Sequence, residues 1–317
     1  MSTPTASTSD RRRNAGPNWG YAFLAWADRF VPAWLFEPAL KLGTWFALAT
    51  MPTERRHSRD YLRQIFQREP TLREVWKHFF TFTEMFMLRL RVAEGRPHRC
   101  RALPSGGEFS ALMASGRPAL LGTFHFGNSD LLGFLLGEFK RHVHMVRLRV
   151  ENSRDTARLY RQFGEWVTFI WVNDHRNLLF ALKDAAQSGG SIALKCDRPD
   201  YSAKLEPFQF LGAQRLFPFT IYHLALVFDQ PVVLCVSVPG AEDESLVHSS
   251  PVFEPGHRSK EENLVRARAH FQDFLIHLET LLRENPYVWF NFTPLNPVAR
   301  QAAPGTVESV PPATLSC

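Results

Sequence analysis

The sequence predicts an α/β fold, in which a mostly parallel or mixed central sheet is flanked by helices, with an N-terminal helical region before it. After residue 117, short apolar stretches alternate with amphipathic ones, which is typical of strands that alternate with helices packed on the sheet. Residues 260–284 then carry apolar side chains at helical spacing. By contrast, the segment Trp19 to Met51 is almost continuously apolar and aromatic.

The elements of the alternating region follow one another closely along the chain. Strands are expected at 119–124, 142–150, 167–172 and 191–197, and helices at 131–139, 153–163 and 176–186. The apolar stretches 219–228 and 231–238 continue the alternation, and YVWFNF at 287–292 is expected to be the last strand.

Four segments are expected from the composition. Residues 1–18 and 297–317 are rich in Ser, Thr, Arg, Pro or Ala, and neither carries enough apolar side chains to offset chain entropy, so both are predicted to be disordered tails, the first of them basic. Between them we expect a helical, membrane-associated region at 19–101 and an α/β domain at 102–296.

The membrane prediction rests on the segment Trp19 to Met51. Its apolar run is interrupted by Asp28, Arg29, Pro32, Glu37, Pro38 and Lys41. A simple transmembrane helix, which needs about 20 apolar residues, is therefore not expected. Kinked helices in the membrane interface fit better, with Trp19, Trp26, Trp34 and Trp45 at headgroup depth. An ordinary buried helical hairpin is the alternative.

The charge pattern points to an acidic or anionic partner. The net charge of +6 is accounted for by residues 53–101, which hold twelve Lys or Arg against six Asp or Glu. Together with 27 Phe and 8 Trp, this basic stretch suits anionic headgroups or an acidic carrier protein. The alternatives are a solvated helical face and a core rich in Phe. No nucleic-acid-binding motif is present, so nucleic acid is not an expected partner.

The sequence also contains a helix-capping signal and four cysteines. Thr71 and Glu74 form a capping box that opens a helix expected to run to Gly95. The four cysteines are widely spaced with no CxxC pair, which argues against a disulfide framework and against a zinc site.

The candidate catalytic stretch is GTFHFGNSD at 122–130. If His125 ends a strand and Asp130 lies in the first turn of the next helix, with Gly127 allowing the bend, the carboxylate can reach the imidazole. Such a pair fixes the tautomer and leaves the second ring nitrogen as a base. In a regular helix the two side chains would instead point about 140° apart. No GxSxG nucleophile is present, so the base would deprotonate a substrate hydroxyl or amine that attacks an activated acyl group.

HFGNSD resembles the HxxxxD signature of the glycerolipid acyltransferase superfamily. The order of the sequence blocks resembles one branch of it, the late acyltransferases of lipid A biosynthesis, the lauroyl and myristoyl type. The blocks are the aromatic segment Trp19 to Met51, the basic stretch 53–101, His125 to Asp130, CDRPDYSAKLEPFQFLG at 196–212 and NPYVWFNF at 285–292. The resemblance spans residues 19 to 293.

The resemblance implies transfer of a fatty acyl group from acyl carrier protein, or from acyl-CoA, to a hydroxyl or amine of a lipid or glycolipid. The reaction would take place at the cytoplasmic face of the inner membrane, with the protein peripheral or monotopic and without a cofactor. His125 would be the general base and Asp130 its orienting partner. The implied substrate-binding residues are Gly127, Asn128, Arg147, Arg149, Asp197, Arg198, Phe208, Phe210 and Gly212. Backbone amides near the turn, or Arg149, would hold the oxyanion.

The sequence departs from the family pattern in two places that concern the acceptor. Ser129 stands where the family has Trp, and residues 290–293 lack the basic side chains expected to meet phosphate or sugar. We therefore expect an acceptor less anionic than lipid A.

Two alternatives remain open at this point. The chain could be a non-catalytic membrane-surface protein that retains the fold, and Asp197 with Arg198 could be a plain ion pair. A metal site formed by His125, His142 and His144 is not expected, because no carboxylate or thiolate stands at a ligand-like spacing.

Overall fold

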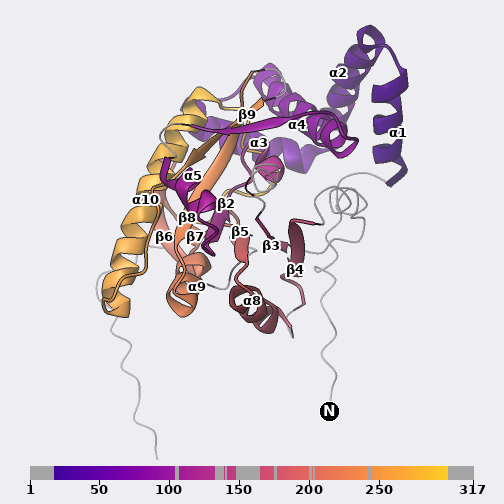
Figure 1. Ribbon diagram of the computed structural model, residues 1–317. Helices are drawn as coiled ribbons and strands as arrows, with labels where there is room; N and C mark the ends of the chain where they lie inside the picture. Colours follow the sequence, from indigo (N-terminus) through magenta and orange to yellow (C-terminus); the bar gives the residue numbers. More distant parts are fainter. Residues whose placement is uncertain are drawn as a thin grey trace, which may run out of the picture.

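The computed structural model describes residues 18–103, 107–132, 139, 141–147, 165–174, 177–199, 202, 204–241 and 244–298. Their centre is a seven-stranded sheet of order β1-β9-β8-β2-β5-β3-β4, and β6 and β7 form a separate hairpin. The five strands from β8 to β4 are parallel to one another, whereas β9 runs antiparallel to β8. The predicted fold class, an α/β protein with a mostly parallel, mixed sheet flanked by helices, is confirmed (Figure 1).

The described elements are an N-terminal helical region, the strands, and the helices that connect or follow the strands. The helical region comprises α1 (Asn18–Phe30), α2 (Ala33–Thr50), α3 (Pro52–Phe66) and α4 (Leu72–Ala93). The strands are β1 (Arg99–Ala102), β2 (Leu120–Thr123), β3 (Val143–Arg147), β4 (Val167–Trp171), β5 (Ser191–Lys195), β6 (Leu205–Phe210), β7 (Ala213–Pro218), β8 (Val232–Pro239) and β9 (Glu244–Ser249). The remaining helices are α5 (Gly107–Ala114), the 3₁₀ turn η3 (Ser129–Leu132), α8 (Leu178–Gln187), α9 (Thr220–Phe228) and α10 (Lys260–Glu284).

Several sequence predictions can be compared with these bounds. The strands expected at 119–124, 142–150, 167–172 and 191–197 correspond to β2, β3, β4 and β5, and the capping box at Thr71 opens α4 as predicted. The structure does not describe the two predicted tails, apart from Asn18 and residues 297 and 298. The helix expected at 153–163 and most of the helix expected at 131–139 also lie outside the described residues. Strands β1 and β9 and the β6–β7 hairpin were not predicted, and β1 begins three residues before the expected start of the α/β domain at 102.

The prediction of a last strand at 287–292 was wrong. This segment has only one isolated bridge, between Phe126 and Trp289, and it does not join the sheet. Its backbone groups bond instead to side chains of the helical region and to the loop after β2. Alternating apolar residues predict an extended chain, but they do not show which partners its backbone will find.

The sheet is buried on both faces because its strands alternate between two apolar layers. Leu120, Ile192, Val232 and Leu234 face a large core built with α3, α4, α8, α9 and α10. Leu121, Ala193, Val233 and Cys235 face a smaller core built with α5 and η3. The central strands are therefore predominantly apolar on both faces.

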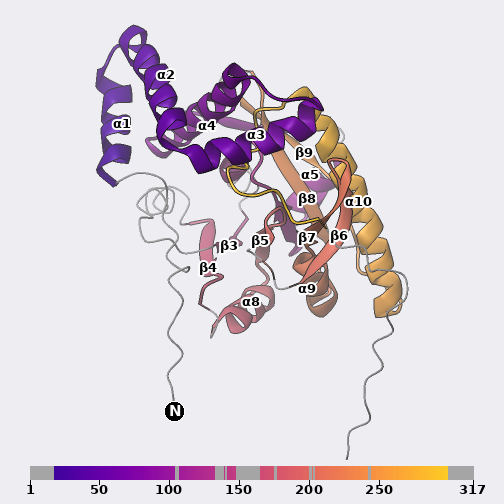
Figure 2. The same ribbon diagram turned by 180° about the vertical axis from the view of Figure 1, so that it is seen from behind.

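The helical region packs through α4. An inner stripe of α1 and α2, with Ala27 and Phe36, contacts Met87 and Leu90 of α4. Asp28 of α1 also receives two hydrogen bonds from Arg91 Nε and Nη2 and a third from Arg96. Helices α1 and α2 stand at one corner of the molecule, opposite α10, in both views (Figures 1 and 2).

We name residues 286–292 the crossing segment, because this part of the chain passes between α3 and the sheet (Figure 2, yellow). Tyr61 donates to the carbonyl of Pro286, and the buried His78 donates through Nε2 to the carbonyl of Trp289 at 2.9 Å. Since that carbonyl can only accept, the neutral ring of His78 carries its proton on Nε2, and Nδ1 accepts the hydroxyl of Ser58 at 2.8 Å. Both ring nitrogens are thus satisfied only while His78 is neutral.

We expect His78 to make the protein less stable in acid. Burial lowers the pKa of His78 to about 4. As the pH falls from about 6.5 toward 4, the unfolded chain takes up a proton at this site and the folded chain does not, so the free energy of unfolding decreases. Between pH 7 and pH 5 this one group removes on the order of 2 kcal/mol.

Urea unfolding of the wild type and of His78→Gln at pH 7 and pH 5 measures this effect. The variant should lose less stability than the wild type between the two pH values. An identical pH dependence in both proteins would show that His78 is not held neutral.

Candidate active site

The register of β2 and β5 brings His125 beside Asp197. The two strands pair in parallel with a constant offset of 72 residues, from Leu120 opposite Ile192 to Thr123 opposite Lys195. The Cys196 amide continues the ladder by donating to Thr123 O at 2.8 Å. The same offset places residue 197 next to residue 125, just past the carboxyl ends of both strands. In open α/β sheets this edge is where ligands bind.

Asp197 accepts three hydrogen bonds, although it keeps only 1% of its surface exposed. Its Oδ1 accepts from Nδ1 of His125 at 2.8 Å. Its Oδ2 accepts from the backbone amide of His125 at 2.7 Å and from the indole Nε1 of Trp289 at 3.2 Å. A buried carboxylate needs such donors, because an unpaired charge in the interior is very costly.

The charges around the pair define the protonation state. Burial alone would raise the pKa of Asp197, but His125, Arg198 and Lys195 together hold it well below its ordinary value. Burial lowers the pKa of His125 to about 4, assisted by the positive charges of Arg198 and Lys195 and opposed by Asp197. At neutral pH the pair is an ionised carboxylate and a neutral imidazole whose proton is on Nδ1. Nε2 is then the basic nitrogen.

The turn after His125 packs tightly against β8. Gly127 has a φ of +53°, and a Cβ there would lie 1.9 Å from the carbonyl oxygen of Ser237. Its amide donates to the carbonyl of Val288 at 2.7 Å. Asn128 is buried, and its side-chain amide donates to Ser245 of β9 at 3.2 Å. Both residues therefore shape the turn that presents His125, as expected, and Asn128 is directed toward the sheet.

Asp130 is the predicted orienting partner of His125. It lies in η3, and its side chain is outside the described residues, so its role stays a prediction. The described carboxylate bonded to Nδ1 of His125 is that of Asp197, a residue 72 positions away that strand register brings beside it.

The predicted basic residues share the carboxyl edge of the sheet with His125. Arg198 lies next to Asp197 and donates to the carbonyl of Phe290 at 3.2 Å. Arg147 ends β3, in line with Lys195 of β5, and its guanidinium lies 5.5 Å from the ring centre of Phe169. Arg149 is outside the described residues.

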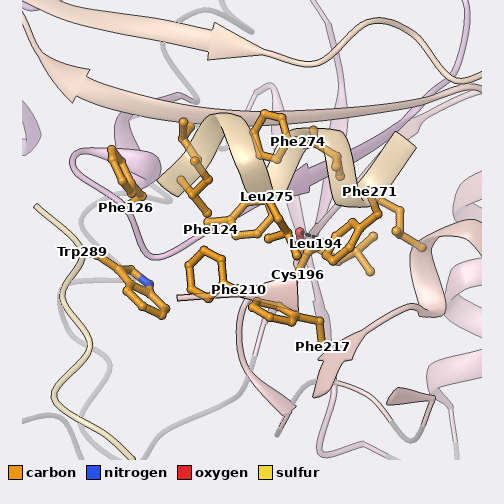
Figure 3. Close-up of a cluster of buried hydrophobic side chains, with 14 of the residues drawn as sticks. Phe124, Phe126, Leu194, Cys196, Phe210, Phe217, Phe271, Phe274, Leu275 and Trp289 are labelled. Atoms are coloured by element: carbon orange, nitrogen blue, oxygen red, sulfur yellow. Dashed lines mark hydrogen bonds between the residues drawn. The ribbon is translucent and has the colours of Figure 1, made fainter. Parts of the chain in front are cut away.

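The residues expected to border an acyl groove belong to the core and to a hairpin turn. Phe208 is buried against Phe271. Phe210 is buried between Phe217 and Trp289 (Figure 3). Gly212 has a φ of +75° and forms the two-residue turn between β6 and β7. Of these three residues, Phe210 contacts Trp289, with ring centres 5.6 Å apart.

The structure separates the histidines that were considered for a metal site. His142 and His144 lie at the beginning of β3, whereas His125 follows the end of the parallel strand β2, so they lie at opposite edges of the sheet. Among the residues that the structure describes, no three His, Cys, Asp or Glu are grouped to hold a metal ion.

Sequence reasoning missed two contributors to the site. Lys195 donates from Nζ to Ser129 Oγ at 2.7 Å and to the carbonyl of Phe124 at 3.2 Å, which ties β5 to the turn after His125. A lysine at the end of an otherwise apolar strand was the available signal. Trp289 was recognised only as part of a terminal block, and nothing in the sequence shows that its N–H reaches Asp197.

Comparison with protein-family models and with curated protein sequences finds no match for this chain. Its chemistry is therefore inferred from the arrangement around His125.

We expect Gly127→Ala to disrupt the site more than an ordinary glycine substitution. The left-handed backbone costs an alanine about 1–2 kcal/mol, and the clash with Ser237 adds to this cost. Gly116→Ala is the matched control, since Gly116 also has a positive φ but a Cβ there meets nothing within 4 Å.

Thermal unfolding of both variants checks this prediction. Gly127→Ala should lose clearly more stability than Gly116→Ala. Equal losses would mean that the turn after His125 is not packed against β8 as described.

Proposed function

We propose that this protein is a membrane-associated acyltransferase that moves a fatty acyl group from an acyl thioester to a hydroxyl or amine of a lipid or glycolipid. The donor would be acyl carrier protein or acyl-CoA. The observation that carries the proposal is the neutral imidazole of His125, held at Nδ1 by an ionised, buried carboxylate at the ligand-binding edge of the sheet. The resemblance of residues 122–130 to an acyltransferase motif supports the same chemistry.

In the proposed reaction Nε2 of His125 takes the proton of the acceptor hydroxyl while its oxygen bonds to the thioester carbon. The tetrahedral intermediate then collapses, the carbon–sulfur bond breaks, and the proton passes from Nε2 to the leaving thiolate. Asp197 stabilises the imidazolium that exists between these two steps. No covalent enzyme intermediate is required, in line with the absence of a recognisable nucleophile motif.

The positive charge that a tetrahedral oxyanion requires is available close to the base. Lys195 and Arg198 are near enough to lower the pKa of His125, and both follow from β5 at the same edge. We propose that these cations, together with backbone amides of the turn, stabilise the negative charge that develops on the thioester oxygen. Arg147 lies farther along the edge and suits an acidic part of the donor.

The proposed membrane contact is the outer face of α1 and α2. Large apolar side chains are exposed there: Phe23, Trp26, Phe30, Trp34, Leu35, Leu42, Trp45 and Phe46. Isolated exposed apolar residues are ordinary, but a continuous group of this size marks an interaction surface. No helix among the described residues is long and apolar enough to cross a membrane. We therefore propose that α1 and α2 lie in the interface, at the cytoplasmic face of the inner membrane.

The acceptor is proposed to be less anionic than lipid A. Residues 290–293, which follow Trp289 in the crossing segment, are Phe, Asn, Phe and Thr. Phe290 and Phe292 stack around His78 and Phe82 of α4, so this stretch forms an aromatic layer. A neutral glycolipid or aminolipid fits such a surface better than a phosphorylated sugar.

A non-catalytic surface protein that retains the fold is the second candidate. Ser129 and the missing basic residues after Trp289 favour it, since both depart from the enzyme pattern. The ordered pair of His125 and Asp197 favours the enzyme.

We expect His125→Ala to lower acyl transfer about 10²- to 10⁴-fold, the usual contribution of a general base. The assay uses labelled acyl-acyl carrier protein and a total lipid extract, with purified protein in detergent. Because the pKa of His125 is lowered to about 4, kcat/KM with a hydroxyl acceptor should stay level from pH 8 down to about 5.5.

Equal product from His125→Ala and wild type would remove His125 from the mechanism. A fall in kcat/KM centred near pH 6.5 would contradict the lowered pKa of His125. No product with either folded protein would favour the non-catalytic candidate.

We expect replacement of the exposed aromatic residues to weaken membrane binding. The triple variant Trp26→Ser, Phe30→Ser and Trp34→Ser should sediment with vesicles containing anionic phospholipid at least about tenfold less than wild type, because it removes a large apolar area from the contact. Leu179→Ser with Phe180→Ser on α8 is the control, since these side chains are equally exposed away from α1 and α2. The same loss in both proteins would contradict the assigned surface.

A further inference from the structure

The crossing segment forms hydrogen bonds to the helical region on one side, and to His125 and the turn after it on the other. Toward the helices, its end at Phe292 offers a carbonyl to Nδ1 of His57 at 3.0 Å, Trp289 offers its carbonyl to His78, and Pro286 offers its carbonyl to Tyr61. These three partners belong to α3 and α4. The segment is thus held by helices that precede it in the chain by more than 190 residues.

On its inner side the same segment surrounds His125. The amide of Gly127 donates to Val288 O at 2.7 Å, and the amide of Phe290 donates to His125 O at 3.2 Å. Arg198 donates to the carbonyl of Phe290. Backbone hydrogen bonds to the crossing segment therefore hold the chain on the carboxyl side of the His125 Cα.

The indole of Trp289 completes this arrangement. Its Nε1 donates to Oδ2 of Asp197 at 3.2 Å, in addition to the amide of His125. The ring is 3% exposed and is packed edge to face between Tyr61 of α3 at 5.2 Å and Phe210 of β6 at 5.6 Å. With two donors on Oδ2 the carboxylate cannot turn about its Cβ–Cγ bond without losing a charged hydrogen bond, so Oδ1 stays directed at Nδ1 of His125.

We propose that Trp289 is a positioning residue for His125: its N–H holds the carboxylate of Asp197 in the orientation that faces His125. Because α3 and α4 hold the crossing segment, this orientation also depends on these two helices. The proposal rests on the proposed function for its catalytic consequence. The hydrogen bond from Trp289 to Asp197 can be tested without any activity. Trp289 touches neither the reacting atoms nor the acyl chain in this account, and it acts only through Asp197.

The test compares two tryptophan variants. Trp289→Phe keeps the aromatic packing and removes the N–H that Asp197 accepts. Trp76→Phe is the matched control, because the buried Nε1 of Trp76 has no hydrogen-bond partner in the described part of the chain, and its ring also stacks on neighbouring aromatic residues. Trp289→Phe loses one hydrogen bond to a charged group, so its kcat should fall about 10- to 100-fold with KM nearly unchanged. Trp76→Phe should keep kcat within about twofold of the wild-type value.

A second measurement separates this proposal from the proposed function and covers the case in which Trp289→Phe does not fold. In wild-type protein labelled with ¹⁵N at tryptophan, the Trp289 indole N–H signal should shift upfield on Asp197→Asn, because a neutral amide is a weaker acceptor than a carboxylate, and the Trp76 signal should stay in place. An unchanged Trp289 signal would overturn the proposal whether or not the protein transfers acyl groups. Equal kcat in Trp289→Phe and Trp76→Phe, in an active wild type, would overturn the positioning role.

Discussion

The bond between Asp197 and His125 is the interaction on which the rest of the site depends. A carboxylate with almost no exposed surface remains ionised only if donors replace the water it has lost, and here an imidazole, a backbone amide and an indole do so. The same three bonds orient the ring and choose its tautomer. These hydrogen bonds therefore both offset the cost of burying the Asp197 carboxylate and prepare His125 as a base.

The arrangement follows from ordinary sheet geometry. Two neighbouring parallel strands end at the same level, so the residues just past their ends become neighbours, and the adjacent cations Lys195 and Arg198 arrive with them. The antiparallel strand β9 supports the turn through Ser245, and the crossing segment closes it from the other side. The helices α3 and α4 hold that segment, which makes them part of the support of the site as well as a platform for α1 and α2.

The sequence predicted much of this, and the failures have physical causes. Apolar runs with helical or strand spacing identified the sheet strands β2 to β5 and the helix α10, and the motif at 122–130 located His125. The contact of Asp197 with His125 was not predicted, because spacing along the chain is visible in a sequence and the register between strands 72 residues apart is not. Phe208 and Phe210 were expected to border a groove. Aromatic side chains suit a core and a binding surface equally well, and only packing against Phe271, Phe217 and Trp289 distinguishes the two. The extended pattern at 287–292 likewise does not show that the chain leaves the sheet to bond with His78.

The most direct test of the account is the ring of His125 observed by NMR in protein labelled with ¹⁵N at histidine, with Asp197→Asn compared with Asp130→Asn. The account predicts a strongly deshielded Nδ1 proton and an unprotonated Nε2 at neutral pH, lost in Asp197→Asn and retained in Asp130→Asn. Loss of that signal in Asp130→Asn with its retention in Asp197→Asn would contradict the assignment of Asp197 as the carboxylate that holds the base.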